Sequence, residues 1–181
     1  MLDMRYEKVN RLLAEAGFSF EERRNITGKL TDIGFFDAPA SSKYHLAYPG
    51  GLADHSINVC EELVRLTKDN GIVWEHIRSP YVVGLLHDIC KHDAYVEKRD
   101  TEAITYEYNK NCLLTGHGDK SMILAIQIIP DLTTEELLCI RYHMGAYYKA
   151  DWDGYDAAIR KYPAVLWTHH ADMIASKLIE K

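Results

Sequence analysis

The sequence predicts an all-α fold, a single helical bundle with room for one short β-hairpin near residues 95–110. Two observations carry this prediction. Apolar residues recur every three or four positions along most of the chain, which is the spacing that gathers them on one face of a helix. Residues that start or stop helices separate these stretches, whereas the alternation typical of a strand is seen over Ile104 to Tyr108.

The N-terminal part is predicted to form two helices. Apolar residues at helical spacing run from Tyr6 to Ala16, and Gly17 ends the run. Ser19 and Glu22 resemble a capping box at the start of the second helix. A loop rich in proline and glycine is expected over residues 37–51.

Two central helices follow. Leu52 to Asn70 is predicted to be one of them, with Gly71 after its end. Ser79-Pro80 opens the next, because serine is a good N-cap and proline suits the first helical position. This helix, Tyr81 to Lys91, is apolar nearly all round, so we expect it to be deeply buried. It contains the adjacent pair His87-Asp88.

The C-terminal half is less regular. Residues 93–114 form the least helical stretch and hold the expected hairpin strand. Residues 145–162 are aromatic and charged, and are expected to form a lid with one short helix. Further helices are predicted over Asp119–Ile129, from the capping box Thr133–Glu136 through His143, and after Pro163.

Composition limits the class of protein. The chain has 181 residues, enough for one domain over residues 1–181 with a real core. No apolar run approaches the ~20 residues that span a bilayer, and the first ten residues lack the apolar core of a signal peptide. The expected location is therefore the cytoplasm. Four widely spaced cysteines form no C-x-x-C pair, which indicates reduced thiols rather than a zinc ribbon.

The charge argues against stable nucleic-acid binding. The net charge is −6, and there is no basic arm or stripe. A small phosphorylated substrate remains compatible with this charge, because bound metal ions can reverse the local field in one cleft. The sequence leaves open whether the protein forms a homo-oligomer.

Histidines inside apolar helices are the candidates for chemistry, because an unpartnered polar ring is costly there. Taken one at a time, each is more often a core residue than a ligand. A helical bundle can nevertheless bring side chains from several helices to one point, which is how many metal sites are built. The candidates are His55, His87, Asp88, His117, His143 and Asp172.

Five motifs in order resemble those of HD-domain metal-dependent phosphohydrolases. Gly50–Ser56 is similar to the first, G-G-L-x-x-H-[ST], and Leu85–Lys91 to the defining L-L-H-D-I-x-K. Gly116-His117, Tyr142–Gly145 and His170–Ala175 resemble the others. The resemblance extends over about residues 35–178, with the helices of residues 1–34 expected to pack on this core.

The resemblance implies two divalent metal ions. In what we call site one, the expected ligands are His55, His87, Asp88 and Asp172. In site two, they are Asp88, His117 and His143, so that Asp88 bridges both ions. Imidazole-rich ligation favours Mn, Fe, Co or Zn. The implied reaction is hydrolysis of a phosphate ester, with a nucleotide as the expected substrate class, and with Asp88 and Lys91 as catalytic residues.

Other residues are weaker candidates. His45, Lys120 and Ser121 are expected to bind substrate, although the last two lie where Asp119 can simply cap a helix. Arg141 is expected at the surface. Three aromatic residues can either stack on a base or pack on the domain: Tyr147, Tyr148 and Trp152.

Two other functions stay open at this stage. A few proteins of the same fold with the same six ligands are mixed-valent di-iron oxygenases, and ligand identity does not separate them from hydrolases. A non-catalytic sensor that binds a nucleotide or a metal is the third reading, although such a module has no need of all six ligands.

Overall fold

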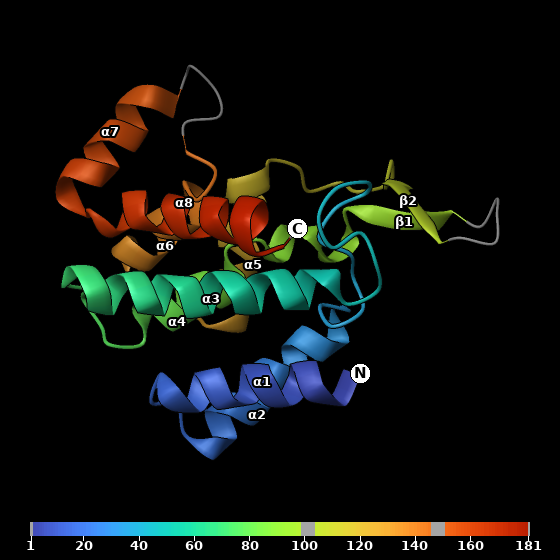
Figure 1. Ribbon diagram of the computed structural model, residues 1–181, viewed down its shortest axis with the longest axis horizontal. Helices are drawn as coiled ribbons and strands as arrows, with labels where there is room; N and C mark the ends of the chain where they lie inside the picture. Colours follow the sequence, from blue (N-terminus) through green and yellow to red (C-terminus); the bar gives the residue numbers. More distant parts are fainter. Residues whose placement is uncertain (1, 99–103, 146–150, 181) are drawn as a thin grey trace.

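The computed structural model describes residues 2–98, 104–145 and 151–180. Within these ranges the chain folds into helices and one two-stranded antiparallel sheet, which confirms the predicted all-α class with a hairpin (Figure 1). The α-helices are α1 (Leu2–Glu15), α2 (Phe20–Asp32), α3 (Gly51–Asn70), α4 (Ser79–Leu86), α5 (His117–Ile128), α6 (Thr134–Arg141), α7 (Trp152–Lys161) and α8 (Ala164–Ile174). A 3₁₀-helix, η1 (Ile89–Asp93), follows α4, and a π-helix, η3 (Ala175–Ile179), follows α8.

Local sequence signals fix several helix ends. At the start of α2, the amide of Glu22 donates to Ser19 Oγ and the amide of Ser19 donates to the Glu22 carboxylate, so the predicted capping box is present. The same reciprocal pair forms at the start of α6. Gly71 ends α3 in the left-handed conformation, which glycine adopts without a steric penalty.

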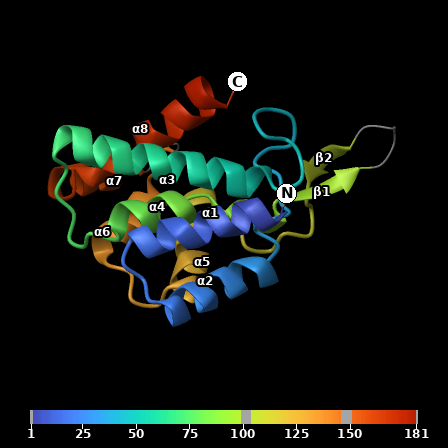
Figure 2. The same cartoon turned by 60° about the horizontal axis from the view of Figure 1, so that its bottom comes forward.

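The long helix α3 is the centre of the bundle. It packs against α4 and α8, and α1 and α2 form a layer on the far side of α4 and α5 (Figures 1 and 2). Apolar side chains of all these helices join one buried cluster, including Leu13, Leu30, Leu63, Leu85 and Val165. No helix in the described ranges is long and apolar enough to cross a bilayer.

Two contacts hold the bundle closely together around α3. A Cβ on Gly84 of α4 would lie 2.4 Å from the Cα of Cys60, so only glycine lets α4 come this near to α3. On the other side, the Arg5 guanidinium of α1 donates two hydrogen bonds, of 2.8 and 2.7 Å, to the carboxylate of Asp54. This bidentate pair ties α1 to the first turns of α3.

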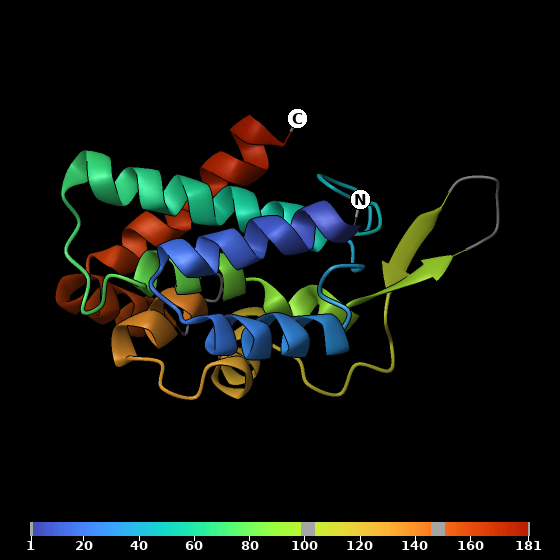
Figure 3. The same ribbon diagram turned by 90° about the horizontal axis from the view of Figure 1, so that it is seen from below.

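The predicted hairpin is formed by β1 (Tyr95–Lys98) and β2 (Thr105–Tyr108). Tyr95 lies directly opposite Tyr108. The two strands extend away from the helices at one end of the bundle (Figure 3). Because Tyr95 and Tyr108 are the strand residues nearest the helices, the hairpin carries two tyrosine rings at its base.

Several expected helices have different bounds; α5, for example, begins at His117 rather than at Asp119. The helix expected over Tyr81–Lys91 is not continuous: α4 ends at Leu86 and the chain tightens into η1 at Ile89. The helix expected to reach His143 ends at Arg141. In the expected lid, α7 begins at Trp152, whereas residues 146–150 lie outside the described ranges.

Candidate metal centre

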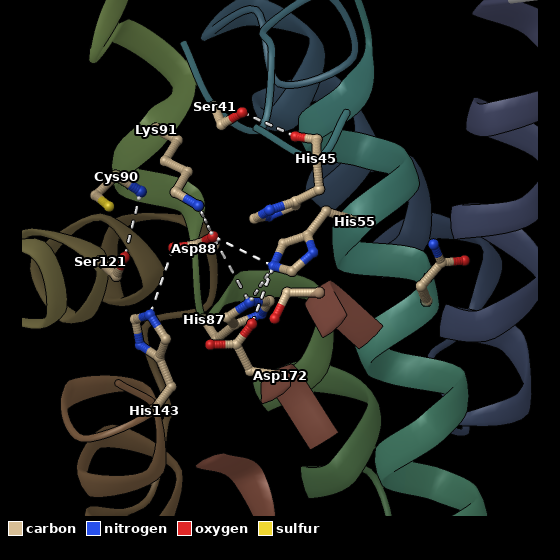
Figure 4. Close-up of polar contacts among 12 residues, drawn as sticks. Ser41, His45, His55, His87, Asp88, Cys90, Lys91, Ser121, His143 and Asp172 are labelled. Carbon is tan, nitrogen blue, oxygen red and sulfur yellow. Dashed lines mark hydrogen bonds and ion pairs between the residues drawn. The ribbon is translucent and has the colours of Figure 1, made fainter. Parts of the chain in front are cut away.

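The break between α4 and η1 falls at His87-Asp88. Asp88 has φ −110° and ψ 14°, outside the α-helical region. In a continuous helix, adjacent side chains point about 100° apart. The turn instead directs both side chains into the space between α3, α6 and α8, where Figure 4 shows them facing His55, His143 and Asp172.

Site one is assembled from α3, the end of α4, and α8. Nε2 of His55 lies 3.2 Å from Nε2 of His87 and 3.3 Å from Oδ1 of Asp172. The three side chains are almost fully buried. Their ligand atoms all lie within 4.8 Å of one another, so one ion can contact all three.

Asp88 faces two directions. Its Oδ2 lies 3.4 Å from Nε2 of His55, in site one. Its Oδ1 lies 2.7 Å from Nε2 of His117 and 3.4 Å from Nε2 of His143, which form site two. One carboxylate therefore presents a different oxygen atom to each group of histidines, as a ligand that bridges two ions does.

Every one of the four imidazoles has a partner at Nδ1. Nδ1 of His87 lies 2.8 Å from the carbonyl oxygen of Gly84, and Nδ1 of His143 lies 2.7 Å from that of Ile140. For His117 the partner is the sulfur of Cys90, at 3.2 Å. A carbonyl accepts only from N–H, so it fixes the tautomer whose Nε2 lone pair faces the centre.

The residues fit a bound cation. Oδ1 of Asp88 and Nε2 of His143 are buried and have no hydrogen-bond partner among the described residues. Such atoms are costly in a core unless something pairs with them. Two ligands at about 2.1 Å from a shared ion lie roughly 3.0–3.4 Å apart, which matches the 3.2 to 3.4 Å spacings in site one.

The electrostatics of the centre also favour cations. Burial lowers the pKa of His87 to about 3, which keeps this imidazole neutral and able to bind a metal. Burial alone would raise the pKa of Asp88, but the charges of Lys91 and His117 hold it well below its ordinary value. Burial likewise opposes ionisation of Asp172, whose pKa is nevertheless lowered by its hydrogen bond with His55. Both carboxylates are therefore charged.

Lys91 lies beside the centre. Its Nζ is 2.5 Å from Oδ2 of Asp88, and its side chain is mostly buried. Burial alone would lower the pKa of Lys91, but the Asp88 carboxylate raises it above the ordinary value, so the ammonium is charged. A fixed positive charge here can hold an anion next to the candidate ligands.

A cavity of about 580 Å³ opens onto this centre. Asp88, His117 and Asp172 line it, as do Lys91 and His45. Tyr95 and Tyr108 form part of its wall, with ring centroids 5.3 Å apart. The cavity is large enough for a nucleotide-sized molecule.

Of the three residues expected to bind substrate, one lines the cavity and two do not. His45 lines the cavity. Lys120 and Ser121 are buried and do not line it. Lys120 pairs with Asp93, and Ser121 Oγ accepts a hydrogen bond from the amide of Cys90, so both side chains support η1 from behind.

Arg141 and the three aromatic candidates lie in different surroundings. Arg141 is not simply at the surface: it is partly buried, lines the cavity and donates to Asp119 at 2.7 Å. Asp119 therefore pairs with Arg141, and α5 has no side-chain cap. Tyr147 and Tyr148 lie outside the described residues, and Trp152 is exposed and does not line the cavity.

Sequence reasoning missed Glu180. This residue follows η3, and its carboxylate lies 3.0 Å from Nδ1 of His55. A single glutamate after an expected helix end carries no signal of its own. Its partner is 125 positions away in the sequence, so only the tertiary structure reveals the contact.

The chain is similar in part to one curated protein. It is 34% identical over 73 residues to a dihydroneopterin 2′,3′-cyclic phosphate phosphodiesterase of Methanocaldococcus jannaschii. The match covers 39% of this chain and 29% of that protein, so it extends over less than a third of the relative. No protein-family model matches the chain, and no solved structure was found to match it.

Proposed function

We propose that the protein is a metal-dependent phosphohydrolase that cleaves a phosphate ester with two bound divalent transition-metal ions. The observation that carries this proposal is Asp88, whose two oxygens face two separate groups of imidazoles at 3.4 Å and 2.7 Å. A paired-ion centre is a recurrent device for cleaving phosphate esters. The partial similarity to a phosphodiesterase supports the same reaction class.

In this proposal the ligands are those expected from the sequence: His55, His87, Asp88 and Asp172 in site one, and Asp88, His117 and His143 in site two. Bound there, such ions supply Lewis acidity and lower the pKa of a water molecule. Lys91 holds a phosphate oxygen beside them and offsets its charge. The buried surroundings strengthen these interactions by excluding water.

The cavity wall favours a substrate with a planar ring. Tyr108 is 70% exposed and Tyr95 is half-buried beside it. Burial raises the pKa of Tyr95 to about 12, so its phenol is neutral. Because base-on-tyrosine stacking contributes ~1–3 kcal/mol, we propose a nucleotide or a similar heterocyclic phosphodiester as the substrate. The cytoplasmic location stays a prediction, and the oligomeric state stays open.

A hydrolysis panel with Mn²⁺ tests the proposal. It compares p-nitrophenyl phosphate, bis-p-nitrophenyl phosphate, nucleoside 2′,3′-cyclic phosphates and nucleoside monophosphates. Turnover is expected to vanish in Asp88→Asn and to persist in Asp69→Asn, an exposed aspartate on α3 that pairs with Arg65. Metal-loaded protein without turnover on any ester would overturn the proposal. It would favour the sensor, or the di-iron oxygenase if bound iron supports oxygen-dependent product formation.

The ring requirement has its own test. Tyr108→Ala is expected to raise KM for the preferred nucleotide by about 5- to 100-fold, since it removes a stacking surface. Tyr108→Phe keeps the ring and should leave KM near the wild-type value. An equal KM in all three proteins would remove the tyrosine wall from the proposal.

A further inference from the structure

Glu180 is a buried carboxylate without a role in the proposed function. It follows η3, yet only 1% of its side chain is exposed. Both carboxylate oxygens lie within hydrogen-bond distance of Nδ1 of His55, at 3.0 and 3.1 Å. The side-chain amide of Asn58 donates to Oε1 at 3.0 Å.

The partners of Glu180 all belong to the candidate centre or border it. His55 and Asn58 are three residues apart and therefore lie on the same face of α3. His45, which lines the cavity, has its Nε2 3.8 Å from Oε2 of Glu180. A buried carboxylate is costly unless it is paired and hydrogen-bonded. The segment after α8 is therefore tied to α3 at the very residue that offers a ligand to site one.

His55 differs in this respect from the other three histidines. The rings of His87 and His143 are backed by neutral carbonyl oxygens, and that of His117 by a thiol. A carboxylate behind an imidazole holds the proton on Nδ1 and makes Nε2 a stronger electron donor. The ring of His55 is therefore oriented by charge as well as by geometry.

A different role for Glu180 is that of a metal ligand together with His45 and His55. The ligand atoms of His45, His55 and Glu180 lie within 4.8 Å of one another, which is compatible with a further ion. His55 would then have to bind one ion through Nε2 and another through Nδ1. The amide N–H of Asn58 also points at Oε1 of Glu180, where it would face such an ion. The hydrogen-bonded arrangement satisfies His55, Asn58 and Glu180 without an additional cation. It leaves Nε2 of His45 without a hydrogen-bond partner among the described residues.

We propose that Glu180 is a positioning residue: it orients His55 and sets the affinity of site one for its ion. This inference rests on the metal centre of the proposed function. It goes further by dividing the centre into one site braced by a carboxylate and one that is not. It also assigns a task to Glu180, which lies outside every expected motif.

The test compares Glu180→Gln and Glu180→Ala with the matched control Glu61→Gln. Glu61 is a glutamate of α3 itself, but its side chain is exposed and pairs with Lys8 of α1. Glutamine keeps an oxygen that can accept from His55 and Asn58, so it removes the charge and preserves the shape. Titration of each metal-free protein with Zn²⁺ alone, followed by calorimetry and metal analysis, gives the number of ions and their affinities.

The expected result is two ions in every protein. One of them should be bound about 10- to 100-fold more weakly in Glu180→Gln, and more weakly again in Glu180→Ala. Long-range ¹H–¹⁵N spectra of the Zn²⁺ proteins add a readout that a merely structural role would not move. The Nδ1–H tautomer of His55 should be retained in the wild type and in Glu61→Gln, and lost or mixed in Glu180→Ala.

The failures can be told apart. If the wild type binds no Zn²⁺, both the metal centre and this inference are overturned. If it binds two ions and Glu180→Gln binds them equally well, Glu180 is not a positioning residue, and the proposed function is untouched. If the wild type binds three ions and Glu180→Gln binds two, Glu180 is a ligand and the inference is wrong.

Discussion

The two sites of the candidate centre share Asp88 but differ in their surroundings. In site one, His55, His87 and Asp172 are buried between three helices. Nδ1 of His55 contacts Glu180, 125 positions away in the sequence, and Nδ1 of His87 contacts the carbonyl oxygen of Gly84, one turn away. In site two, the side chain of His117 is 37% exposed and lines the cavity, and its Nδ1 contacts the thiol of Cys90. The two sites thus differ in one ligand: His143 is as buried as the histidines of site one, whereas His117 lies at the edge of the core.

This difference has a consequence for how the sites work. Ligands inside the core are fixed by the packing that folds the protein, so site one is prearranged. A ligand at the edge can move with the cavity wall, which suits an ion that meets substrate. We therefore expect site one to bind its ion more tightly, and site two to lose its ion first during dialysis against a chelator.

Replacing Asp88, the residue that both sites share, should disrupt both sites at once. Asp88→Asn keeps the shape but removes the charge that faces both groups. We expect loss of at least one ion and a fall in hydrolysis of about 10⁴-fold, the scale seen when one member of a catalytic unit is removed. Metal analysis and turnover measure it, with Asp69→Asn as the control. Two tightly bound ions in Asp88→Asn would mean that this carboxylate does not bridge the sites.

Single histidine replacements should separate the sites. His117→Ala is expected to remove one ion and to change the free energy of unfolding of the metal-free protein by less than about 0.5 kcal/mol, because the side chain is partly exposed. His87→Ala should also remove an ion, but should cost about 2–3 kcal/mol, since it leaves a cavity and frees the carbonyl of Gly84.

Urea titrations in the presence of a chelator measure the free energies, and metal analysis counts the ions. If the metal content stayed at two ions in both His117→Ala and His143→Ala, the assignment of site two would be wrong. Equal unfolding costs for His87→Ala and His117→Ala would contradict the contrast between core and edge.

A glycine substitution should disturb site one without touching a ligand. A Cβ at Gly84 would force α4 away from Cys60 of α3, and so would separate His87 from His55. We expect Gly84→Ala to cost about 1–3 kcal/mol and to weaken the site-one ion. Gly28→Ala in α2, where nothing lies within 4 Å of the added atom, should instead stabilise the protein by about 0.5–1 kcal/mol.

The smallest effect is expected behind site two. Cys90→Ala removes the sulfur that lies 3.2 Å from Nδ1 of His117. A thiol is a weak hydrogen-bond partner, so the site-two ion should be weakened by less than about 10-fold. Zn²⁺ titration compares this variant with Cys112→Ser. If Cys90→Ala weakened the site-two ion more than Glu180→Gln weakens the site-one ion, Cys90 would support its histidine more strongly than Glu180 does, contrary to this expectation.

The sequence predicted the elements whose signals are local. The capping boxes at Ser19 and Thr133, the glycine after α3 and the alternating strand each depend on a few neighbouring residues, and each was confirmed. The six expected ligands do converge on one centre, but their role as ligands stays a prediction. So does the organisation as one domain.

What the sequence did not predict depends on distant contacts. The break at Asp88 arises in a run that reads as one apolar helix, so periodicity alone hides it. Lys120 was expected near the substrate, but it pairs with Asp93, which comes from another element. Glu180 was missed because its role depends on the tertiary contact with His55, which the sequence does not reveal.

The contact between Arg5 and Asp54 sets a practical limit on how this chain can be trimmed. A gene fragment cut to residues 35–178, the stretch that carries the motifs, would still encode all six expected ligands. It would lack Arg5, which pairs with Asp54 next to His55, and it would lack Glu180. It would also lack the apolar side chains with which α1 and α2 cover the core. The motif boundaries are therefore narrower than the part of the chain that supports the centre. A shortened protein should keep α1 and the residues through Glu180.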